Sequence, residues 1–322
     1  MDCSGEDKTS ADSVIVRSFY HWQSDFSLND TQDKFLEDLK VEEIYLHLFD
    51  VVWDGEKAIP TAITEISSHP SQKIKPVVYI TTDVFANLDS SEISELVENI
   101  GTKISNAMLD FPYEELQFDC DWMPSIKDKY FFFLEEMKAH FPKKIISSTV
   151  RLYQYKYPDL AGVPPVDKAL LMYYNMGELT NYAEPNSILN NKIGNQYLGF
   201  NVYPLPIDIA LPNFEWCLHF RLNQLQQITN HFDSDDLKNG SLFTKLDDRN
   251  YTFTKDTVIE STYYRFGDQI RFENSPEADL LEAAKSLLVE INQDTTRIIF
   301  YDLRENTKED YEKLDAVYTV FE

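Results

Sequence analysis

Eight short apolar segments with strand character alternate with helix-like segments along the chain, and this alternation limits the possible folds more than any other feature. The strands are expected at residues 14–23, 43–50, 74–81, 116–122, 144–151, 169–174, 207–211 and 297–302. Helices are expected at residues 30–39, 90–108, 125–141 and 189–203, from residue 276 onward and at the end of the chain. Strands that alternate with helices favour a parallel sheet, and eight such units indicate a closed (β/α)8 barrel, also called a TIM barrel.

The alternation is interrupted between residues 217 and 275, where polar turns separate short β-rich runs. We expect a β-rich insertion there, before the last barrel strand. Residues 1–12 are small, polar and charged, which predicts a disordered leader. Residues 13–322 hold neither an internal repeat nor a linker rich in Pro, Gly or Ser, so we expect a single barrel domain that includes the insertion.

The composition excludes several classes of function. The formal net charge is −26, from 55 acidic and 29 basic residues, so we expect the chain to repel nucleic acid and anionic membrane surfaces. A neutral or cationic ligand, such as a sugar, is compatible with this charge. The chain contains no GxGxxG, GxxxxGKS/T or HExxH motif, so we expect no nucleotide cofactor and no zinc-binding helix.

The three cysteines are odd in number and form no CxxC pair, so a disulfide framework is not expected; they are Cys3, Cys120 and Cys217. Cys3 and the polar residues after it resemble the start of a mature bacterial lipoprotein, in which a lipidated cysteine carries a flexible tether. This resemblance implies a membrane tether through Cys3 and a location in the cell envelope. The alternative is a cysteine that stands by chance in the tail of a cytoplasmic protein. No protein partner is implied.

The strand at residues 116–122 carries two carboxylates on one face. Because side chains alternate between the faces of a strand, Gln117, Asp119 and Asp121 share one face, and Phe118 and Cys120 share the other. We expect the polar face to point into the barrel and the apolar face to contact the helices. Inward carboxylates are costly to bury, so they favour a functional site. The alternative is that they cap loops or pair with an arginine.

In TIM barrels the functional residues lie at the C-terminal ends of the strands. All four tryptophans fall at or just after such an end, where their rings suit the faces of sugar rings. Among the histidines, His21 is expected near the site and His47 is expected to face the helices. The carboxylates expected to take part in catalysis are Asp50, Asp119, Asp121 and Glu178. The residues expected to bind a ligand are Trp22, Trp53, Tyr79, Gln117, Trp122, Arg151, Tyr174, Asn175, Trp216 and Asp302.

Paired carboxylates are the groups that cleavage of a glycosidic bond requires. One is protonated and acts as the general acid, while the other is a base, a nucleophile or a stabiliser of positive charge. We expect Asp121 to be the acid or stabiliser and Asp119 to orient it, with the two like charges raising one pKa. A metal ion held by Asp119, Asp121 and Asp302 is an alternative, although we expect no metal.

The segment FDCDW, followed by a helix, resembles the DxxDxDxE strand of family-18, chitinase-type glycosidases, and LMYYNMG resembles their later M-x-Y-D/N strand. Aligned on the shared aspartates, Met123 stands where that family has its catalytic Glu, and Leu116 stands where it has its first Asp. A thioether cannot donate a proton. Either another carboxylate is the acid, or the site binds a glycan without cutting it.

A wider pattern, which includes YHWQ, IYLHLFDVVWD, IDIALPNFEW and IIFYDL, is similar to a group of bacterial barrels. Members of this group are often lipoproteins and are classed with the glycosidase-type barrels, but the group's function is not established. The two resemblances imply a glycoside hydrolase-like enzyme that acts on a glycan at the C-terminal face of the barrel. The alternatives are a non-catalytic, glycan-binding lipoprotein of the cell envelope and a purely structural domain.

Overall fold

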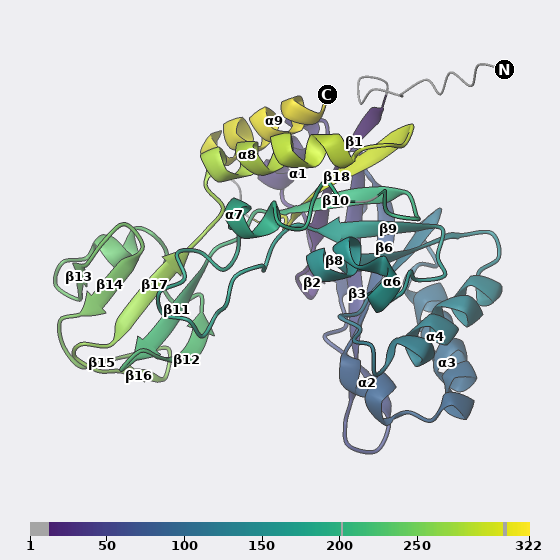
Figure 1. Cartoon of the computed structure of the whole chain (residues 1–322), viewed down its shortest axis with the longest axis horizontal. Coiled ribbons are helices and arrows are strands. Elements are labelled where there is room, and N and C mark those ends of the chain that lie inside the picture. The colour runs from purple at the N-terminus through teal and green to yellow at the C-terminus, as the bar shows by residue number, and fades with distance from the viewer. Residues whose placement is uncertain (1–12, 201, 305–307) are drawn as a thin grey trace. The chain divides into compact units, whose positions relative to one another are not determined.

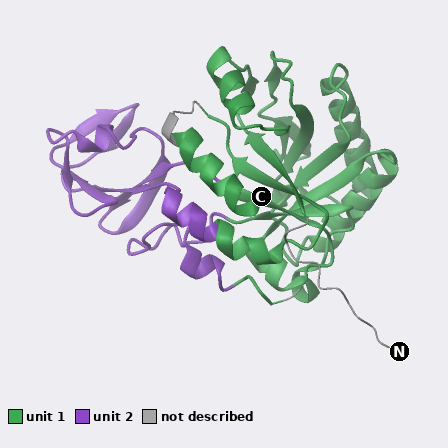
Figure 2. Cartoon of the chain, turned by 90° about the horizontal axis from the view of Figure 1, so that it is seen from above, with its two compact units in different colours: residues 1–173, 197–211, 284–322 green, residues 174–196, 212–283 purple. Residues whose placement is uncertain are grey.

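The computed structural model describes residues 13–200, 202–304 and 308–322 (Figure 1). Cys3 and the predicted leader at residues 1–12 lie outside the described residues. The chain forms two compact units, coloured separately in Figure 2. Unit 1 comprises Met1–Tyr173, Tyr197–Leu211 and Ala284–Glu322, and unit 2 comprises Tyr174–Gln196 and Pro212–Ala283.

Unit 1 contains the barrel. Its parallel strands are, in spatial order, β1 (Val14–His21), β3 (Glu43–Trp53), β6 (Lys73–Ile80), β7 (Glu115–Asp119), β8 (Ile145–Arg151), β9 (Lys168–Met172), β10 (Ile207–Pro212) and β18 (Thr295–Tyr301). Strand β1 pairs with both β18 and β3, which closes the sheet. The predicted (β/α)8 barrel is therefore confirmed.

Helices follow the strands and cover their outer side. They are α1 (Asp30–Asp38), α2 (Thr82–Asn87), α3 (Ile93–Ala107), α4 (Lys127–His140), α5 (Leu152–Lys156), α6 (Pro158–Ala161), α8 (Glu277–Leu287) and α9 (Lys308–Phe321). The longest ones between strands, α3 and α4, lie side by side (Figure 1). Helix α1 begins with a capping box in which Asn29 accepts from the backbone of Gln32. Within the described ranges, no helix is long and apolar enough to cross a membrane.

Strand β3 contains an irregularity that changes which side chains point inward. Its pairing with β6 shifts between His47 and Phe49, so that Leu48 is an extra residue. Phe49 lies beneath Lys103 of α3, at 5.2 Å, and thus faces the helices. His47 and Asp50 bond to each other, although a regular strand would place residues three apart on opposite faces.

Three short strands and two single turns complete unit 1. Strand β4 (Ala58–Thr61) pairs antiparallel with the end of β3, and β2 (Asp25–Phe26) pairs with β5 (Glu65–Ile66). The 3-10 turns are η2 (Ser90–Glu92) and η4 (Leu288–Glu290).

Unit 2 is built on an antiparallel sheet with its own core. The sheet order is β12 (Gln224–Thr229), β11 (Trp216–Arg221), β17 (Gln269–Glu273), β14 (Asn250–Phe253) and β13 (Phe243–Lys245). A hairpin of β15 (Thr257–Ile259) and β16 (Thr262–Tyr264) and the turn η3 (Asp236–Lys238) complete the β-rich insertion. Its core is formed by Cys217, Phe232, Leu237, Phe243, Tyr251, Phe253, Tyr264, Ile270 and Phe272.

The helix predicted at residues 189–203 is wrong. Among the described residues of this range, only α7 (Asn191–Gly194) is an α-helix. Glycines disfavour a helix, and Gly199 has a φ of +75°, which is incompatible with a right-handed helix. Residues 174–196 belong to unit 2, so the first part of the range 189–203 is not part of the barrel unit.

Candidate functional site

The C-terminal ends of the barrel strands, which we call the mouth, hold a row of polar side chains. Asp50 on β3 pairs in register with Tyr79 on β6, and Tyr79 pairs with Asp119 on β7. All three are half-buried. Burial and the charge of Asp119 raise the pKa of Tyr79 to about 12, with smaller effects from Asp121 and Asp50. The row therefore places one carboxylate on each side of the neutral phenol of Tyr79.

Asp119 is the carboxylate with the most perturbed pKa at the mouth. Its Oδ1 accepts a hydrogen bond of 2.6 Å from Thr149 Oγ1 on β8. Burial raises the pKa of Asp119 to about 7, and the negative charges of Asp121 and Asp50 add to this effect. Thr149 and Arg151 oppose it only in part. A large share of Asp119 is thus protonated at neutral pH, as a general acid must be.

Asp121 lies just after the end of β7 and pairs with an arginine. Its Oδ1 is 3.2 Å from Arg151 Nε, and the two side chains are 43% and 47% exposed. The expectation that Asp121 is the acid and Asp119 its orienting partner is thus not favoured by the geometry. Of the two, Asp119 is the carboxyl whose pKa is raised by burial.

The inward face of β7 is otherwise as predicted. The hydroxyl of Tyr20 on β1 donates to Gln117 Oε1, so Gln117 points into the barrel. Phe118 contacts Phe133 of α4 edge to face, at 5.2 Å, on the opposite side. Gln117 is fully buried below Asp119. The expected role of Gln117 in binding a ligand stays a prediction, and its burial does not favour that role.

Asp50 is held by a histidine. His47 Nε2 is 2.8 Å from Asp50 Oδ1, and His47 Nδ1 is 3.3 Å from Thr64 Oγ1. The His47 ring lies 4.7 Å from the ring of Trp22, which in turn contacts Tyr301 at 5.5 Å. The expectation that His47 faces the helices is wrong, because the extra residue in β3 lets both His47 and Asp50 lie on the inner side.

His21 has a different place from the one expected. It is buried against Phe26, with ring centroids 4.8 Å apart. Burial lowers its pKa to about 4. His21 is thus a neutral core residue at ordinary pH.

The predicted aromatic platforms divide into two groups. Trp22 and Trp53 are half-buried in unit 1. Trp122 is only 2% exposed, stacks on Tyr130 of α4 and donates its indole N–H to the Ala161 carbonyl. The expectation that Trp122 is a sugar platform is wrong, because its ring is packed against the helix layer and is not accessible to a sugar.

Asp302 follows β18 and is engaged by a cation. Arg304 Nε donates to its Oδ1 at 2.6 Å, while burial raises its pKa. Among the described residues, no three His, Cys, Asp or Glu side chains are grouped as ligands for a metal ion. The metal alternative with Asp119, Asp121 and Asp302 therefore has no support from the geometry.

Four of the candidates belong to unit 2 rather than to the barrel. Trp216 is held by Glu273, which accepts its indole N–H at 2.8 Å, and it contacts Phe214 at 5.2 Å. Tyr174 lies against the same Phe214, at 6.1 Å. The other two are Asn175, whose φ is +53°, and Glu178, which accepts from Thr180 Oγ1 at 3.0 Å.

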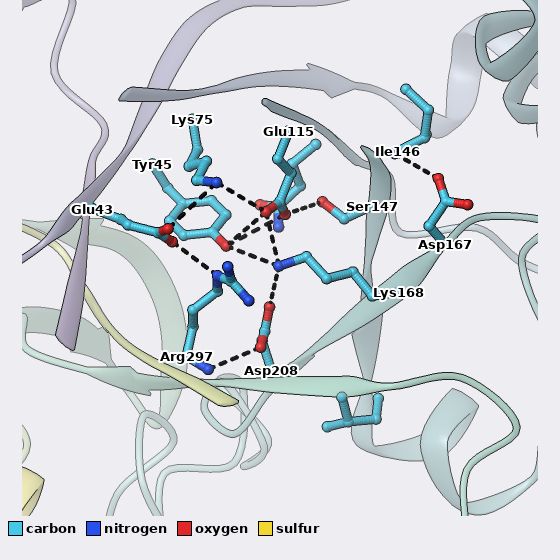
Figure 3. A network of polar contacts seen from close by, with 12 residues as sticks. Glu43, Tyr45, Lys75, Glu115, Ile146, Ser147, Asp167, Lys168, Asp208 and Arg297 are labelled. Atoms are coloured by element: carbon cyan, nitrogen blue, oxygen red, sulfur yellow. Dashed lines mark hydrogen bonds and ion pairs between the residues drawn. The ribbon is translucent and has the colours of Figure 1, made fainter. Parts of the chain in front are cut away.

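A network of buried charges fills the barrel near the starts of its strands, and the sequence analysis missed it. Lys168 Nζ is 2.8 Å from Glu115 and 2.5 Å from Asp208 (Figure 3). Arg297 Nε is 2.8 Å from Glu43, and Lys75 lies 3.4 Å from Glu43 and 3.6 Å from Glu115. Three carboxylates thus face three cations. The sequence does contain a sign of this network, because each of these six charged residues lies within or beside an apolar segment that predicts a strand.

Comparisons with known proteins agree with this architecture. No family model matches the sequence, and no curated protein matches it. Among solved structures, a chitinase from Rhizomucor miehei has a TM-score of 0.51 at 10% identity, covering 96% of this chain and 100% of that chain. A chitinase from Bacteroides thetaiotaomicron has a TM-score of 0.51 at 12% identity, covering 96% and 97%.

A fungal endo-beta-N-acetylglucosaminidase from glycosyl hydrolase family 18 has a TM-score of 0.50 at 11% identity, covering 95% of this chain and 97% of that chain. Identities this low show the fold alone. The chain shares its barrel fold with these two chitinases and this family-18 enzyme, and the predicted resemblance to glycosidase-type barrels is confirmed at the level of the fold.

Proposed function

We propose that this protein is a glycoside hydrolase whose active site is the barrel mouth and whose general acid is Asp119. The observation that carries the proposal is the state of Asp119, an inward carboxyl with a pKa raised to about 7, mainly by burial. A second carboxylate, Asp50, stands two strands away in the same row. A protonated acid beside a second carboxylate is the arrangement that glycosidic bond cleavage uses.

The ligand class follows from the side chains around this pair. Trp22, Trp53 and Tyr79 are half-buried aromatic residues at the ends of β1, β3 and β6, and such rings pack on the C–H faces of sugars. A net charge of −26 disfavours anionic substrates. The barrels with similar folds include chitinases. These observations favour a neutral or cationic glycan.

The mechanism differs from one that uses a Glu at the end of β7. Met123 occupies that position and is 49% exposed. A thioether has no proton to give, so the acid is a different residue. Asp119 lies four residues earlier, on the inner face of the strand, and its protonated form can serve.

Substitution of Asp119 tests the proposal. The wild-type protein is incubated with chito-, cello-, xylo- and mannotetraose, and new reducing ends are measured. Asp119→Asn keeps the shape but cannot ionise, and we expect its kcat to fall by roughly 10²–10⁴-fold while the protein stays folded. The matched control is Asp128→Asn, at a 96% exposed position on α4, which should keep full activity. Equal activity of Asp119→Asn and the wild type would contradict the proposal.

The second candidate function is binding of a glycan without hydrolysis, and the observation that favours it is Met123 in place of a catalytic Glu. Binding of an uncut tetraose by the wild type, weakened by Trp53→Ala but not by Asp119→Asn, would select this function. An envelope location through lipidated Cys3 suits either function. It predicts that a palmitate analogue labels the native protein and not its Cys3→Ser variant.

A further inference from the structure

We propose that Asp50 is the catalytic base that acts opposite Asp119, and that the reaction inverts the configuration of the anomeric carbon. This inference rests on the proposed hydrolase function and adds to it the second catalytic residue and the stereochemical outcome. Four observations carry it: the register of the strands, the state of the other carboxylates, the contacts of His47 and the place of the aromatic rings.

The register sets the distance between the two carboxylates. Asp50, Tyr79 and Asp119 are direct partners on three neighbouring strands, so two strand spacings of about 4.8 Å separate the first and last Cα atoms, about 10 Å in all. Side chains that point into a closed barrel converge, which brings the carboxyl groups closer than the Cα atoms. Inverting glycosidases hold their carboxyl groups about 6.5–9.5 Å apart and retaining ones about 5–5.5 Å apart. The spacing fits an inverting pair with a water molecule beside the base.

Two other carboxylates near the strand ends of unit 1, Asp121 and Asp302, pair with arginines. Asp121 is 3.2 Å from Arg151, and Asp302 is 2.6 Å from Arg304. Each of these ion pairs engages the Oδ1 atom of the carboxylate with a guanidinium. Asp50 is instead 2.8 Å from a histidine. Asp50 is therefore the partner of Asp119 that is best placed to take a proton.

His47 is a positioning residue for Asp50. Its Nε2 contacts Asp50 Oδ1, its Nδ1 contacts the Thr64 hydroxyl, and its ring lies against that of Trp22 at an interplanar angle of 37°. Contacts on both nitrogens and on the ring face fix the imidazole, and the imidazole in turn fixes one carboxylate oxygen. The other oxygen, Oδ2, is the one that accepts the proton. Trp22 also contacts Tyr301, so the aromatic rings of Trp22 and Tyr301 lie next to the His47–Asp50 pair.

The proposed reaction is balanced by these two residues and one water molecule. The carboxylic acid of Asp119 gives its proton to the glycosidic oxygen, and the C1–O bond breaks with its electron pair going to that oxygen. The water oxygen attacks C1 from the opposite face, and the proton it loses goes to Asp50. The products are a hemiacetal of inverted configuration and an alcohol. Proton exchange with solvent then returns Asp50 to its charged form and Asp119 to its protonated form.

The first-formed anomer tests the proposal with the unmodified protein. Proton NMR follows the wild type as it cleaves whichever of chito-, cello-, xylo- or mannotetraose it hydrolyses, before mutarotation. We expect the anomer opposite to that of the substrate. A first product of retained configuration overturns the inverting pair and leaves the hydrolase function standing. Hydrolysis of none of the four tetraoses contradicts the hydrolase function, and the inference is overturned with it.

Variants of the base and of its histidine give a second test. Asp50→Asn should lower kcat by roughly 10²–10⁴-fold, and Asp121→Asn should lower it far less. His47→Phe should lower kcat by about 10-fold with KM within about 2-fold, and His47→Gln, which keeps a donor for Asp50, should restore most of the loss. Full activity of Asp50→Asn, or a loss in Asp121→Asn as large as in Asp50→Asn, would overturn the assignment.

Discussion

Asp119 combines a buried position with a single hydrogen bond from Thr149 and two nearby negative charges, from Asp121 and Asp50. Burial disfavours the charged form, and the like charges act in the same direction. Its neighbour on the strand, Asp121, differs because Arg151 pairs with it in a largely exposed position. Two aspartates, two residues apart, thus lie in different surroundings: burial raises the pKa of Asp119, while Asp121 pairs with Arg151.

The raised pKa of Asp119 predicts a pH dependence of stability. Its usual pKa is 3.8 and its folded value is about 7. Between these values the folded state holds a proton that the unfolded chain releases, so the contribution of Asp119 to stability falls as pH rises from about 4 to about 7 and is constant above. Asp119→Asn cannot ionise. We therefore expect its free energy of unfolding, relative to the wild type, to rise between about pH 4 and about pH 8 in urea titrations.

The exposed variant Asp128→Asn serves as the matched control, because an exposed carboxyl changes little on folding. Its difference from the wild type should be the same at both pH values. A constant difference for Asp119→Asn as well would show that its carboxyl is charged in the folded protein near pH 4.

At the scale of elements, one strand and one helix decide how the mouth is built. The extra residue in β3 puts His47 and Asp50 on the inner side while Phe49 still faces α3. Helix α4 is anchored to the end of β7 by Trp122, which stacks on Tyr130 and donates to Ala161. Trp122, just after a strand end, therefore belongs to the packing between barrel and helices, while Trp22 and Trp53 are only half-buried at the mouth.

Truncation of the tryptophans separates these two roles. Trp122→Ala removes a buried ring and a hydrogen bond, so we expect the free energy of unfolding to fall by about 3–5 kcal/mol, as for other large-to-small core changes. Trp53→Ala, at a half-buried position, should cost much less stability and should weaken glycan binding. Thermal unfolding and isothermal titration with the cleaved tetraose distinguish the two. A small stability loss for Trp122→Ala would contradict its assignment to the core.

At the scale of the whole molecule, the barrel interior of unit 1 has a charged lower part, near the starts of the strands, and the candidate site at the strand ends. The lower part holds three acids and three bases in mutual contact, so the charges are compensated within the barrel (Figure 3). Buried ion pairs add little net stability, but the loss of one partner leaves the others uncompensated. Unit 2 has a separate apolar core and carries four of the residues first expected at the mouth.

Removal of one cation tests this balance. Lys168 is 89% buried and contacts two carboxylates, so Lys168→Met should lower the free energy of unfolding by about 3–5 kcal/mol. The matched control is Lys138→Met, because Lys138 pairs with Asp167 in an exposed position, and its loss should cost less than about 1 kcal/mol. Urea denaturation measures both. Equal costs for the two variants would show that the buried network is not coupled as described.

The sequence by itself determined the features that depend on short-range patterns. The alternation of segments indicated the barrel, because each segment's preference for strand or helix is local. The period of two on β7 placed Gln117 and Asp119 inside and Phe118 outside, because alternation is a property of any strand. Only the tertiary structure decided that burial raises the pKa of Asp119, that Arg151 pairs with Asp121, that β3 has an extra residue at Leu48 and that six charges meet inside the barrel. Each of these depends on distances between residues far apart in the chain, and no local pattern encodes such distances.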